Sequence, residues 1–246
     1  MSSLRIATYN IHKGVQGIGP RRRLEIHNLG LAVEQMDADI VCLQEVRKLH
    51  RREATYFDHW PTQPQADYLA PLGYEAVYRT NATTRHGEHG NAMLSRWPVQ
   101  RHQHEDISDH RFEQRGLLHC EVQMDGRLVH VIVVHLGLFR AGRVRQMAQL
   151  QAYIAREVPA DAALVVAGDF NEGVRLVGSS LAGVGLKTCN QAALPTFPSR
   201  LPLAQLDHVL LRGLVPCEVH VPRGRIWAQM SDHLPLIVDV QWEVGT

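Results

Sequence analysis

Two short apolar runs, each followed directly by polar residues, are the feature that most restricts how this chain can fold. The first is Ile40-Val41-Cys42-Leu43, which ends in Gln44-Glu45. The second spans residues 163–167 and ends in Gly168-Asp169-Phe170-Asn171. Short apolar runs with such boundaries are typical of buried strands. The chain therefore places polar side chains at the ends of at least two strands of its core.

A helix-like segment precedes each of these two runs. Residues 23–36 carry apolar side chains at helical spacing, and so do residues 144–157. A further strand is expected before each helix, at residues 4–11 and 127–136. The two halves of the chain thus share one strand–helix–strand pattern, although no residues align between them.

The rest of the chain favours strands, which we expect at residues 75–79, 91–95, 115–124, 205–211 and 234–242. Asp125-Gly126, between two of the expected strands, is the strongest two-residue hairpin signal. Residues 55–73 contain three prolines and favour helix fragments and loop. We expect one α/β domain over residues 1–246, with two sheets packed face to face and helices outside.

Composition narrows the class of protein. The chain has 246 residues, 45% of them hydrophobic, which is enough to bury a large core. Its net charge of +1 gives no overall signature of polyanion binding. The four cysteines form no CxxC pair, so a disulfide framework is not expected and a reducing compartment fits better. Because no apolar run approaches a transmembrane span and no leader is apparent, we expect a cytoplasmic protein.

Glu45 is the first candidate for chemistry, since it follows a buried strand directly. Asn10 ends the neighbouring expected strand and could hold a ligand beside it. Hard divalent cations such as Mg²⁺ prefer carboxylate, amide and water oxygens, and Asn and Glu side by side suit them. A helix cap or a surface acid is the alternative for Glu45.

Asp169 and Asn171 are stronger candidates. They lie two residues apart, so their side chains would point the same way in an extended backbone. A carboxylate that accepts a proton and an amide that donates a hydrogen bond could activate water and hold phosphate. The alternative is an Asx turn that closes the strand.

Two Asp-His dipeptides follow, Asp207-His208 and Asp232-His233. A carboxylate that accepts from one imidazole nitrogen fixes the orientation of the ring and favours its protonated form. The partner need not be the sequence neighbour. Each dipeptide alone is a weak signal for a catalytic site. The strand-end carboxylates elsewhere in the chain strengthen that interpretation.

Together these residues resemble the endonuclease/exonuclease/phosphatase superfamily, the DNase-I-like fold. Any one motif is unspecific, but six motifs occur in the family order and span Asn10 to His233. They are Thr8-Tyr9-Asn10-Ile11-His12, Leu43-Gln44-Glu45-Val46, Gly90-Asn91-Ala92, Gly168-Asp169-Phe170-Asn171, Leu206-Asp207-His208-Val209 and Ser231-Asp232-His233-Leu234-Pro235.

The resemblance implies a four-layer α/β sandwich of two mixed sheets flanked by helices, and hydrolysis of a phosphodiester with Mg²⁺ or Mn²⁺. It implies Glu45 as the principal metal ligand, with Asn10 nearby and Asp232 as a further metal-site or supporting carboxylate. The number of metal ions stays open.

The same resemblance implies the catalytic roles. Asp169 would activate the attacking water and Asn171 would contact the phosphate. Asp207 would orient His233 toward the scissile phosphate, although Asp169 and His233 could exchange roles. His135 would bind the phosphate as well. Asn91 and Arg115 are implied as substrate-binding residues.

The sequence leaves the substrate open. Basic residues after the expected strand ends favour a nuclease; they are Lys13, Arg21, Arg22, Arg23, Arg47, Lys48, Arg51, Arg52, Arg140, Arg143 and Arg145. The near-zero net charge favours a phosphodiesterase for a phospholipid or a small metabolite. A non-catalytic phosphate-binding module is disfavoured, because no expected catalytic position is substituted. Trp227 is either a packing residue or a surface for stacking. Cleavage polarity, diester against monoester specificity and oligomeric state also stay open.

Overall fold

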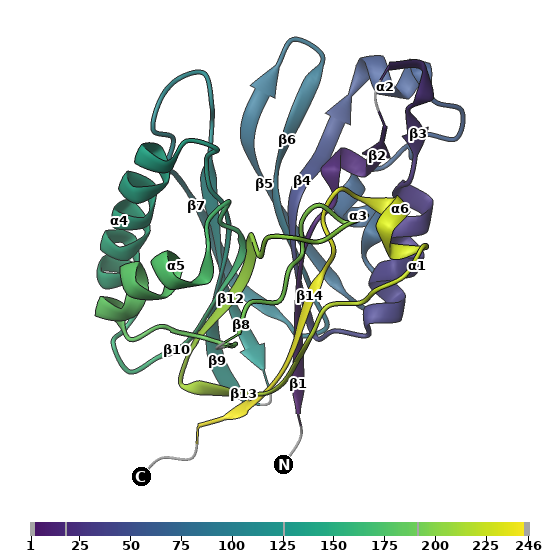
Figure 1. The fold of residues 1–246 in the computed structure, drawn as a ribbon. Coiled ribbons are helices and arrows are strands. Elements are labelled where there is room, and N and C mark those ends of the chain that lie inside the picture. The colour runs from purple at the N-terminus through teal and green to yellow at the C-terminus, as the bar shows by residue number, and fades with distance from the viewer. Residues whose placement is uncertain (1–2, 18, 125, 191, 244–246) are drawn as a thin grey trace.

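A computed structural model describes residues 3–17, 19–124, 126–190 and 192–243, and it shows four layers. Two sheets pack face to face in the middle, and helices cover the outer face of each (Figure 1). The four-layer α/β sandwich predicted from the sequence is confirmed.

Within the described residues, the first sheet has six strands in the order β13-β14-β1-β4-β6-β5. In that order their bounds are Leu214–His220, Leu236–Trp242, Leu4–Asn10, Ile40–His50, Gly87–Ser95 and Glu75–Thr84. The second sheet has six strands in the order β11-β12-β10-β9-β8-β7. Their bounds are Lys187–Thr188, Asp207–Arg212, Ala163–Asp169, Arg127–His135, Gly116–Met124 and Val99–Asp106.

Each sheet is mixed because it contains one parallel pair. Strand β1 runs parallel to β4, and β9 runs parallel to β10. The crossover helices are α1 (Ile26–Met36) and α4 (Arg140–Glu157). These are the two strand–helix–strand units expected from the sequence.

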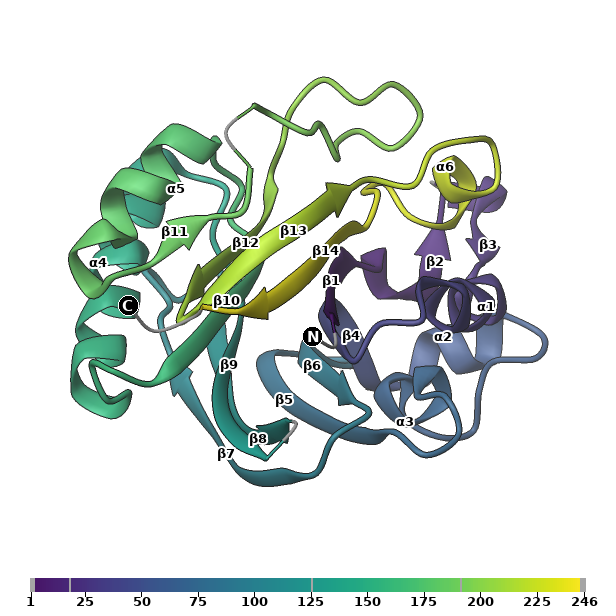
Figure 2. The ribbon, with the colours of Figure 1, turned by 90° about the horizontal axis from the view of Figure 1, so that it is seen from below.

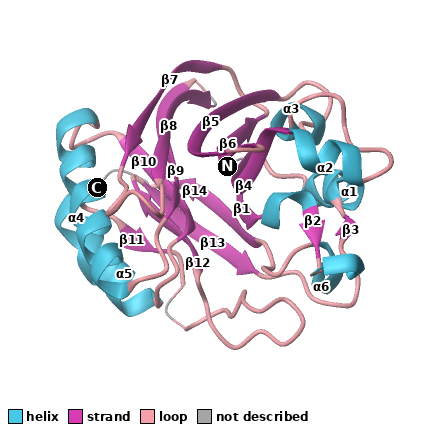
Figure 3. Cartoon of the chain, turned by 90° about the horizontal axis from the view of Figure 1, so that it is seen from above, coloured by secondary structure: helices cyan, strands magenta, loops and turns pink. Residues whose placement is uncertain are grey.

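The remaining helices complete the outer layers. In the views from below and above, α5 (Val174–Leu181) lies beside α4 on one side of the molecule (Figures 2 and 3). On the other side, α2 (Arg51–Tyr56), α3 (Gln65–Leu69) and α6 (Trp227–Met230) join α1. A small hairpin of β2 (Val15–Gln16) and β3 (Arg23–Leu24) lies next to them. No helix of the described chain combines the length and apolarity needed to cross a bilayer.

The core has three apolar layers, because side chains alternate between the two faces of every strand. Ile6, Cys42 and Val131 pack between the sheets. Tyr9 points to the other face of β1 and packs against the helices of the first sheet. Leu150 of α4 packs on the outer face of the second sheet. Both parallel pairs are therefore buried on two faces, which explains their near-continuous apolar sequences.

Several predicted boundaries were wrong. The helix expected from Arg23 begins at Ile26, because Arg23 and Leu24 pair with β2. The strand expected to stop at Leu43 continues to His50, through a break in register between Leu43 and Val46. The hairpin between β8 and β9 forms up to the pair Met124 and Arg127, while Asp125 lies outside the described residues.

Strands β7 and β13 were not predicted from the sequence, and neither were the two-residue strands β2, β3 and β11. Strands β7 and β13 each lie at one edge of a sheet with one neighbouring strand, and most of their residues are at least partly exposed. Strand β7 is mostly polar, and β13 contains Pro216, which is tolerated at a sheet edge. Neither strand carries the apolar pattern that predicted the buried strands.

Candidate active site

The polar residues singled out from the sequence gather where the two sheets meet at one edge. Asn10 is the last residue of β1, His135 the last of β9 and Asp169 the last of β10. The start of β1 and the end of β14 lie at the opposite edge (Figure 1). The register of the second sheet places Asp169 between His135 on β9 and Asp207 on β12. Strand ends therefore fix the backbone of the site.

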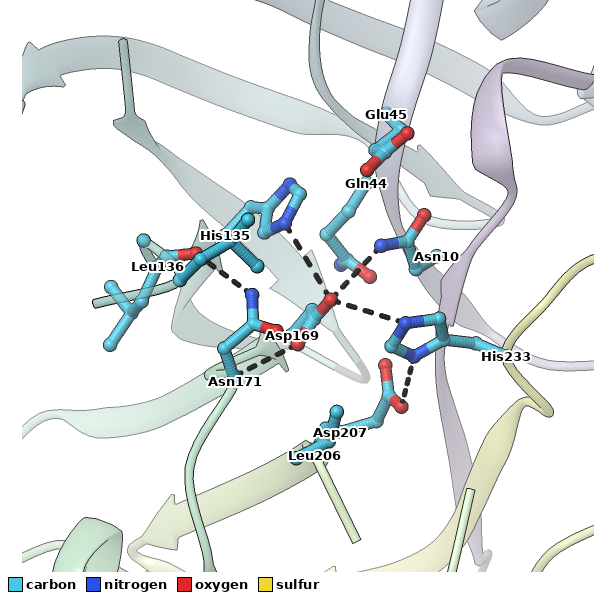
Figure 4. A network of polar contacts seen from close by, with 12 residues as sticks. Asn10, Gln44, Glu45, His135, Leu136, Asp169, Asn171, Leu206, Asp207 and His233 are labelled. Carbon is cyan, nitrogen blue, oxygen red and sulfur yellow. Dashed lines mark hydrogen bonds and ion pairs between the residues drawn. The ribbon is translucent and has the colours of Figure 1, made fainter. Parts of the chain in front are cut away.

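Asp169 is the centre of the polar network (Figure 4). Its Oδ2 accepts a hydrogen bond of 3.0 Å from Nδ2 of Asn10, which joins the two sheets. The Nε2 atoms of His135 and His233 each lie 3.6 Å from the same oxygen. Burial disfavours the charged carboxylate and raises the pKa of Asp169, against the charge of His233. Asp169 is thus a buried carboxylate with the imidazoles of His135 and His233 beside it.

His233 bridges Asp169 and Asp207. Its Nδ1 lies 2.8 Å from Oδ2 of Asp207, which also accepts a hydrogen bond of 2.6 Å from Oγ1 of Thr196. Burial lowers the pKa of His233, but the charges of Asp207 and Asp169 outweigh it and raise the pKa to about 10. The imidazole is therefore held protonated at neutral pH, with its orientation fixed from the Asp207 side.

Glu45 comes from a bulge and not from a strand end as expected. The break in register after Leu43 puts an extra residue into β4, and Glu45 takes a φ of 58°. A bulge of this kind turns a side chain away from the regular pleat. Nζ of Lys13 lies 2.5 Å from Oε2 of Glu45. Burial disfavours the ionised form, yet the charge of Lys13 outweighs it and lowers the pKa of Glu45.

The other proposed metal ligands have partners of their own. Oδ1 of Asn10 accepts from the backbone N–H of His12 at 3.1 Å. Oδ2 of Asp232 lies 3.0 Å from Nδ1 of His12. Burial opposes ionisation of Asp232, but the hydrogen bond and charge of His12 lower its pKa. Glu45 and Asp232 are therefore both ionised carboxylates, with the ammonium of Lys13 beside the first and the imidazole of His12 beside the second.

The donor set of Glu45, Asn10 and Asp232 suits a hard divalent cation, because all of its donors are oxygens. Lys13 already supplies positive charge at the Glu45 carboxylate. Among the described residues at this edge, Asp169, Asp207 and His233 also have possible ligand atoms within 4.8 Å of one another. These atoms are buried, and within the trio His233 is hydrogen-bonded to Asp207 and lies 3.6 Å from Asp169.

Asn171 does not continue the strand, which corrects the expectation of an extended pair. Its φ is 51°, and its backbone N–H donates to Oδ1 of Asp169 at 2.9 Å. This is the Asx turn that the sequence left open as the alternative. Nδ2 of Asn171 donates to the carbonyl of Leu136 at 3.0 Å. The turn therefore holds the Asp169 carboxylate and brings Asn171 beside the end of β9.

The implied phosphate-binding residues surround this point. Burial and the charge of Arg115 lower the pKa of His135 to about 4, so its imidazole is neutral. Nε of Arg115 donates to the carbonyl of Leu136 at 3.1 Å, and Nη2 lies 3.2 Å from Oε1 of Glu113. Asn91 is fully buried, and its Nδ2 donates to the carbonyls of Gly116 and Val133. Asn91 thus joins the two sheets, and its Oδ1 has no partner among the described residues.

Other sequence candidates lie away from the site or are neutralised. Nε2 of His208 contacts the carbonyl of Glu172 at 2.7 Å, away from Asp207. Trp227 is 9% exposed and packs with the apolar layer of α1, as a packing residue would. Six of the eleven basic residues expected at the rim pair with carboxylates: Lys13 with Glu45, Arg22 and Arg47 with Glu53, Arg23 with Glu25, Arg143 with Glu172, and Arg145 with Asp109.

Two contacts had no signal in the sequence. Thr196 lies in the long segment between β11 and β12, far from any motif, yet it donates to Asp207. Lys13 stood out only as one of many basic residues, and its ion pair with Glu45 depends on the short 3₁₀ turn at His12–Gly14. Both contacts arise from loop conformation, which short motifs do not encode.

Comparisons with known proteins agree on the family. The model of the Endonuclease/Exonuclease/phosphatase family matches residues 7–233. The chain is 35% identical to the uncharacterised protein YbhP of Escherichia coli K12, over 97% of this chain and 96% of that protein.

Solved structures share the fold at low identity. An endonuclease/exonuclease/phosphatase from Bacteroides vulgatus has a TM-score of 0.76 at 17% identity and covers 99% of this chain and 100% of that one. The mannosyl-6-phosphatase Bt3783 of Bacteroides thetaiotaomicron has a TM-score of 0.72 at 17% identity, over 98% and 100%. TDP2 of D. rerio, solved with a single-strand DNA product, has a TM-score of 0.68 at 16% identity, over 98% and 100%.

Proposed function

Because the chain belongs to the endonuclease/exonuclease/phosphatase family of hydrolytic phosphoesterases, we propose that it is a divalent-metal-dependent phosphodiester hydrolase acting on nucleic acid. The observation that carries the proposal is the chain of contacts from Asp207 through His233 to Asp169. It combines an oriented, protonated imidazole with a buried carboxylate 3.6 Å away. We propose that residues 1–246 serve this site as one catalytic domain.

Asp169 would take the proton of the attacking water. Its raised pKa makes it a stronger base than an exposed carboxylate, and its Asx turn fixes the direction of its Oδ1. His233 would stand over the scissile phosphate as a cation and stabilise the charge that develops there. Because Asp207 is already in place before substrate binds, the imidazolium needs little reorganisation.

Glu45 would hold the Mg²⁺ or Mn²⁺ ion, with the amide of Asn10 and the carboxylate of Asp232 as neighbours. A bound ion supplies Lewis acidity and neutralises charge on the phosphoryl oxygens. Lys13 would have to leave the Glu45 carboxylate to admit the ion and could then bind the phosphate. Asn171, His135 and Arg115 would position the phosphate from the β9 side.

The choice of nucleic acid rests on charge near the site. The fold itself does not decide, because one relative by structure is named as a mannosyl-6-phosphatase and another was solved with single-strand DNA. Arg21, Arg23 and Arg200 line a pocket with Asp232, and of these three arginines only Arg23 is paired with a carboxylate in the described chain. Several such cations favour a polyanionic substrate.

A second candidate is a phosphodiesterase for phospholipids, and one observation favours it. Leu138 and Phe139, which follow His135 closely, are 65% and 68% exposed, and Phe112 is 82% exposed. The ring of His110 lies 6.3 Å from the rings of both phenylalanines. Exposed apolar side chains beside a polar site suit a substrate with an apolar portion.

Nicking of supercoiled plasmid in Mg²⁺ or Mn²⁺ tests the proposal, with EDTA and His233→Ala as controls. We expect nicking that disappears in both controls. Nicking that survives His233→Ala would mean that another site or a contaminant cuts the DNA. Absence of nicking, with EDTA-sensitive hydrolysis of phospholipid diesters, would favour the second candidate.

A further inference from the structure

A pocket of about 600 Å³ opens beside the proposed active site. It is lined by His12, Gln16, Gly17, Arg21, Arg23, Arg200 and Asp232. Asp232 directly precedes His233, and His12 lies two residues after Asn10. Two lining residues of the pocket are therefore close in the chain to proposed site residues. Figure 2 shows the long segment between β11 and β12, which carries Arg200, extending toward α6.

Of the three consecutive arginines Arg21, Arg22 and Arg23, the first and the third line this pocket. Arg22 turns away and pairs with the buried carboxylate of Glu53. Arg21 and Arg23, on either side of it, line the pocket. This alternation is expected where the chain leaves a 3₁₀ turn (Gly19–Arg21) and enters the short strand β3.

Arg200 is tied to the catalytic segment through its neighbour. The backbone N–H of Ser199 donates to the carbonyl of Asp232 at 2.7 Å. Oγ of Ser199 donates to the carbonyl of Ser231 at 2.7 Å. Because Ser199 is buried, these bonds fix the segment that presents Arg200 relative to His233.

The pocket carries surplus positive charge. Arg23 pairs with Glu25 at 3.1 Å, and Asp232 pairs with His12 at 3.0 Å. In the described chain, no carboxylate lies within ion-pair distance of Arg21 or Arg200. Two guanidinium groups are therefore free to bind an anion, and a guanidinium fork matches phosphate oxygens well.

We propose that this pocket binds a second phosphate group of the substrate, next to the scissile phosphate. The inference rests on the proposed function and makes it narrower: the preferred substrate carries successive phosphates along one strand of nucleic acid. A small bisphosphate shares this chemistry, so the experiment has to separate the two sources. Arg21 and Arg200 are assigned here to substrate binding and not to the chemical step.

Three thymidine compounds isolate the second phosphate. TpT contains only the diester, whereas pTpT and TpTp add one phosphate on the 5′ or the 3′ side. We expect the wild type to hydrolyse one of the latter two with a kcat/KM about tenfold above that for TpT, mostly through KM. Arg200→Ala and Arg21→Ala should remove this preference, by raising KM for the compound with the added phosphate to about that for TpT. Arg101→Ala, an exposed arginine on β7, should change nothing.

Binding supplies a readout that does not need turnover. A labelled twelve-nucleotide single strand is titrated into His233→Ala protein, with and without Arg200→Ala. We expect about tenfold weaker binding without Arg200 and a shallower dependence on salt. Stronger binding of the strand than of pTpT or TpTp would identify nucleic acid as the source of the phosphate, and equal binding a small bisphosphate.

The proposal is overturned if neither arginine affects strand binding and the wild type shows no preference among the three compounds. A wild type that hydrolyses none of them in Mg²⁺ or Mn²⁺, while Arg200 still governs strand binding, would instead contradict the proposed function and retain the pocket.

Discussion

Asp207 forms an ion pair with the imidazolium of His233. Replacing it by Asn keeps the shape and a hydrogen-bond acceptor but removes the negative charge that raises the pKa of His233. We expect Asp207→Asn to lower kcat for a diester on the order of 10²-fold or more, with a small change in KM. An NMR titration of His233 should show its pKa fall at the same time.

The second Asp-His dipeptide supplies the control for this variant. The ring of His208 binds the carbonyl of Glu172 and does not touch Asp169 or His233. His208→Gln should therefore keep kcat within a few-fold wherever the protein is folded. If Asp207→Asn kept the wild-type kcat, Asp207 would have only a structural role.

At the scale of residues, the sequence indicated which side chains meet but not how they are held. Asn10, Asp169 and Asp207 lie together because each is at a strand end within a recognisable motif, and His233 joins them from the loop before β14. The bulge at Glu45 was not predictable. Glycine and asparagine are the residues that commonly take a positive φ, and this position holds a glutamate.

At the scale of elements, Gly168 allows the backbones of β10 and β9 to approach each other closely. Its φ is 154°, and a Cβ there would lie 1.9 Å from the carbonyl oxygen of Val134. Because that atom is backbone of the neighbouring strand, the clash cannot be relieved by a side-chain rotation. We expect Gly168→Ala to lower the free energy of unfolding by about 2 kcal/mol or more, measured by urea denaturation.

Gly173, five residues further along, is the matched control. A Cβ at this position meets no atom within 4 Å. It precedes α5 as its N-cap, so Gly173→Ala should change the free energy of unfolding by less than about 1 kcal/mol. Equal effects of the two substitutions would show that the close approach of β10 to β9 is not what requires glycine.

The elements that the sequence predicted best are those buried on both faces. Strands β1, β9 and β10 lie within two residues of their expected bounds, and their side chains are buried on both faces. The outer strands β7 and β13 have one neighbour each and polar exposed faces, so their sequences resemble loops. Tertiary pairing, not local pattern, makes them strands.

At the scale of the whole molecule, thiol reactivity reports on the packing of the sheets. Cys42 and Cys120 lie fully buried between the sheets, and Cys189 is also buried, whereas Cys217 is exposed. Burial raises the pKa of Cys120 and of Cys189 to about 12. We expect one thiol per native chain to react with Ellman's reagent, and four in urea. Cys217→Ser should abolish the native reaction; a remaining fast thiol would show that the sheets open.

Acid stability is a second property of the whole molecule, because several buried histidines resist protonation. Burial and the neighbouring His130 lower the pKa of His119 to about 4, and the Nε2 of His119 lies 2.9 Å from Nδ1 of His130. Burial and the charge of Lys13 lower the pKa of His89 to about 4 as well. Unfolded histidines have a pKa near 6.5.

Between pH 6.5 and 4 the unfolded chain therefore binds more protons than the folded chain at these positions. The stability that they contribute is fully present above pH 6.5 and is lost as the pH falls toward 4, by about 1.4 kcal/mol per pH unit for each proton of difference. Urea denaturation at pH 7, 6 and 5 measures this slope. His119→Gln should reduce the slope of unfolding free energy against pH by an amount that corresponds to up to one proton. This holds whatever the substitution does to stability at pH 7. A variant slope equal to that of the wild type would show that His119 takes up its proton without opening the packing of α4 on the second sheet.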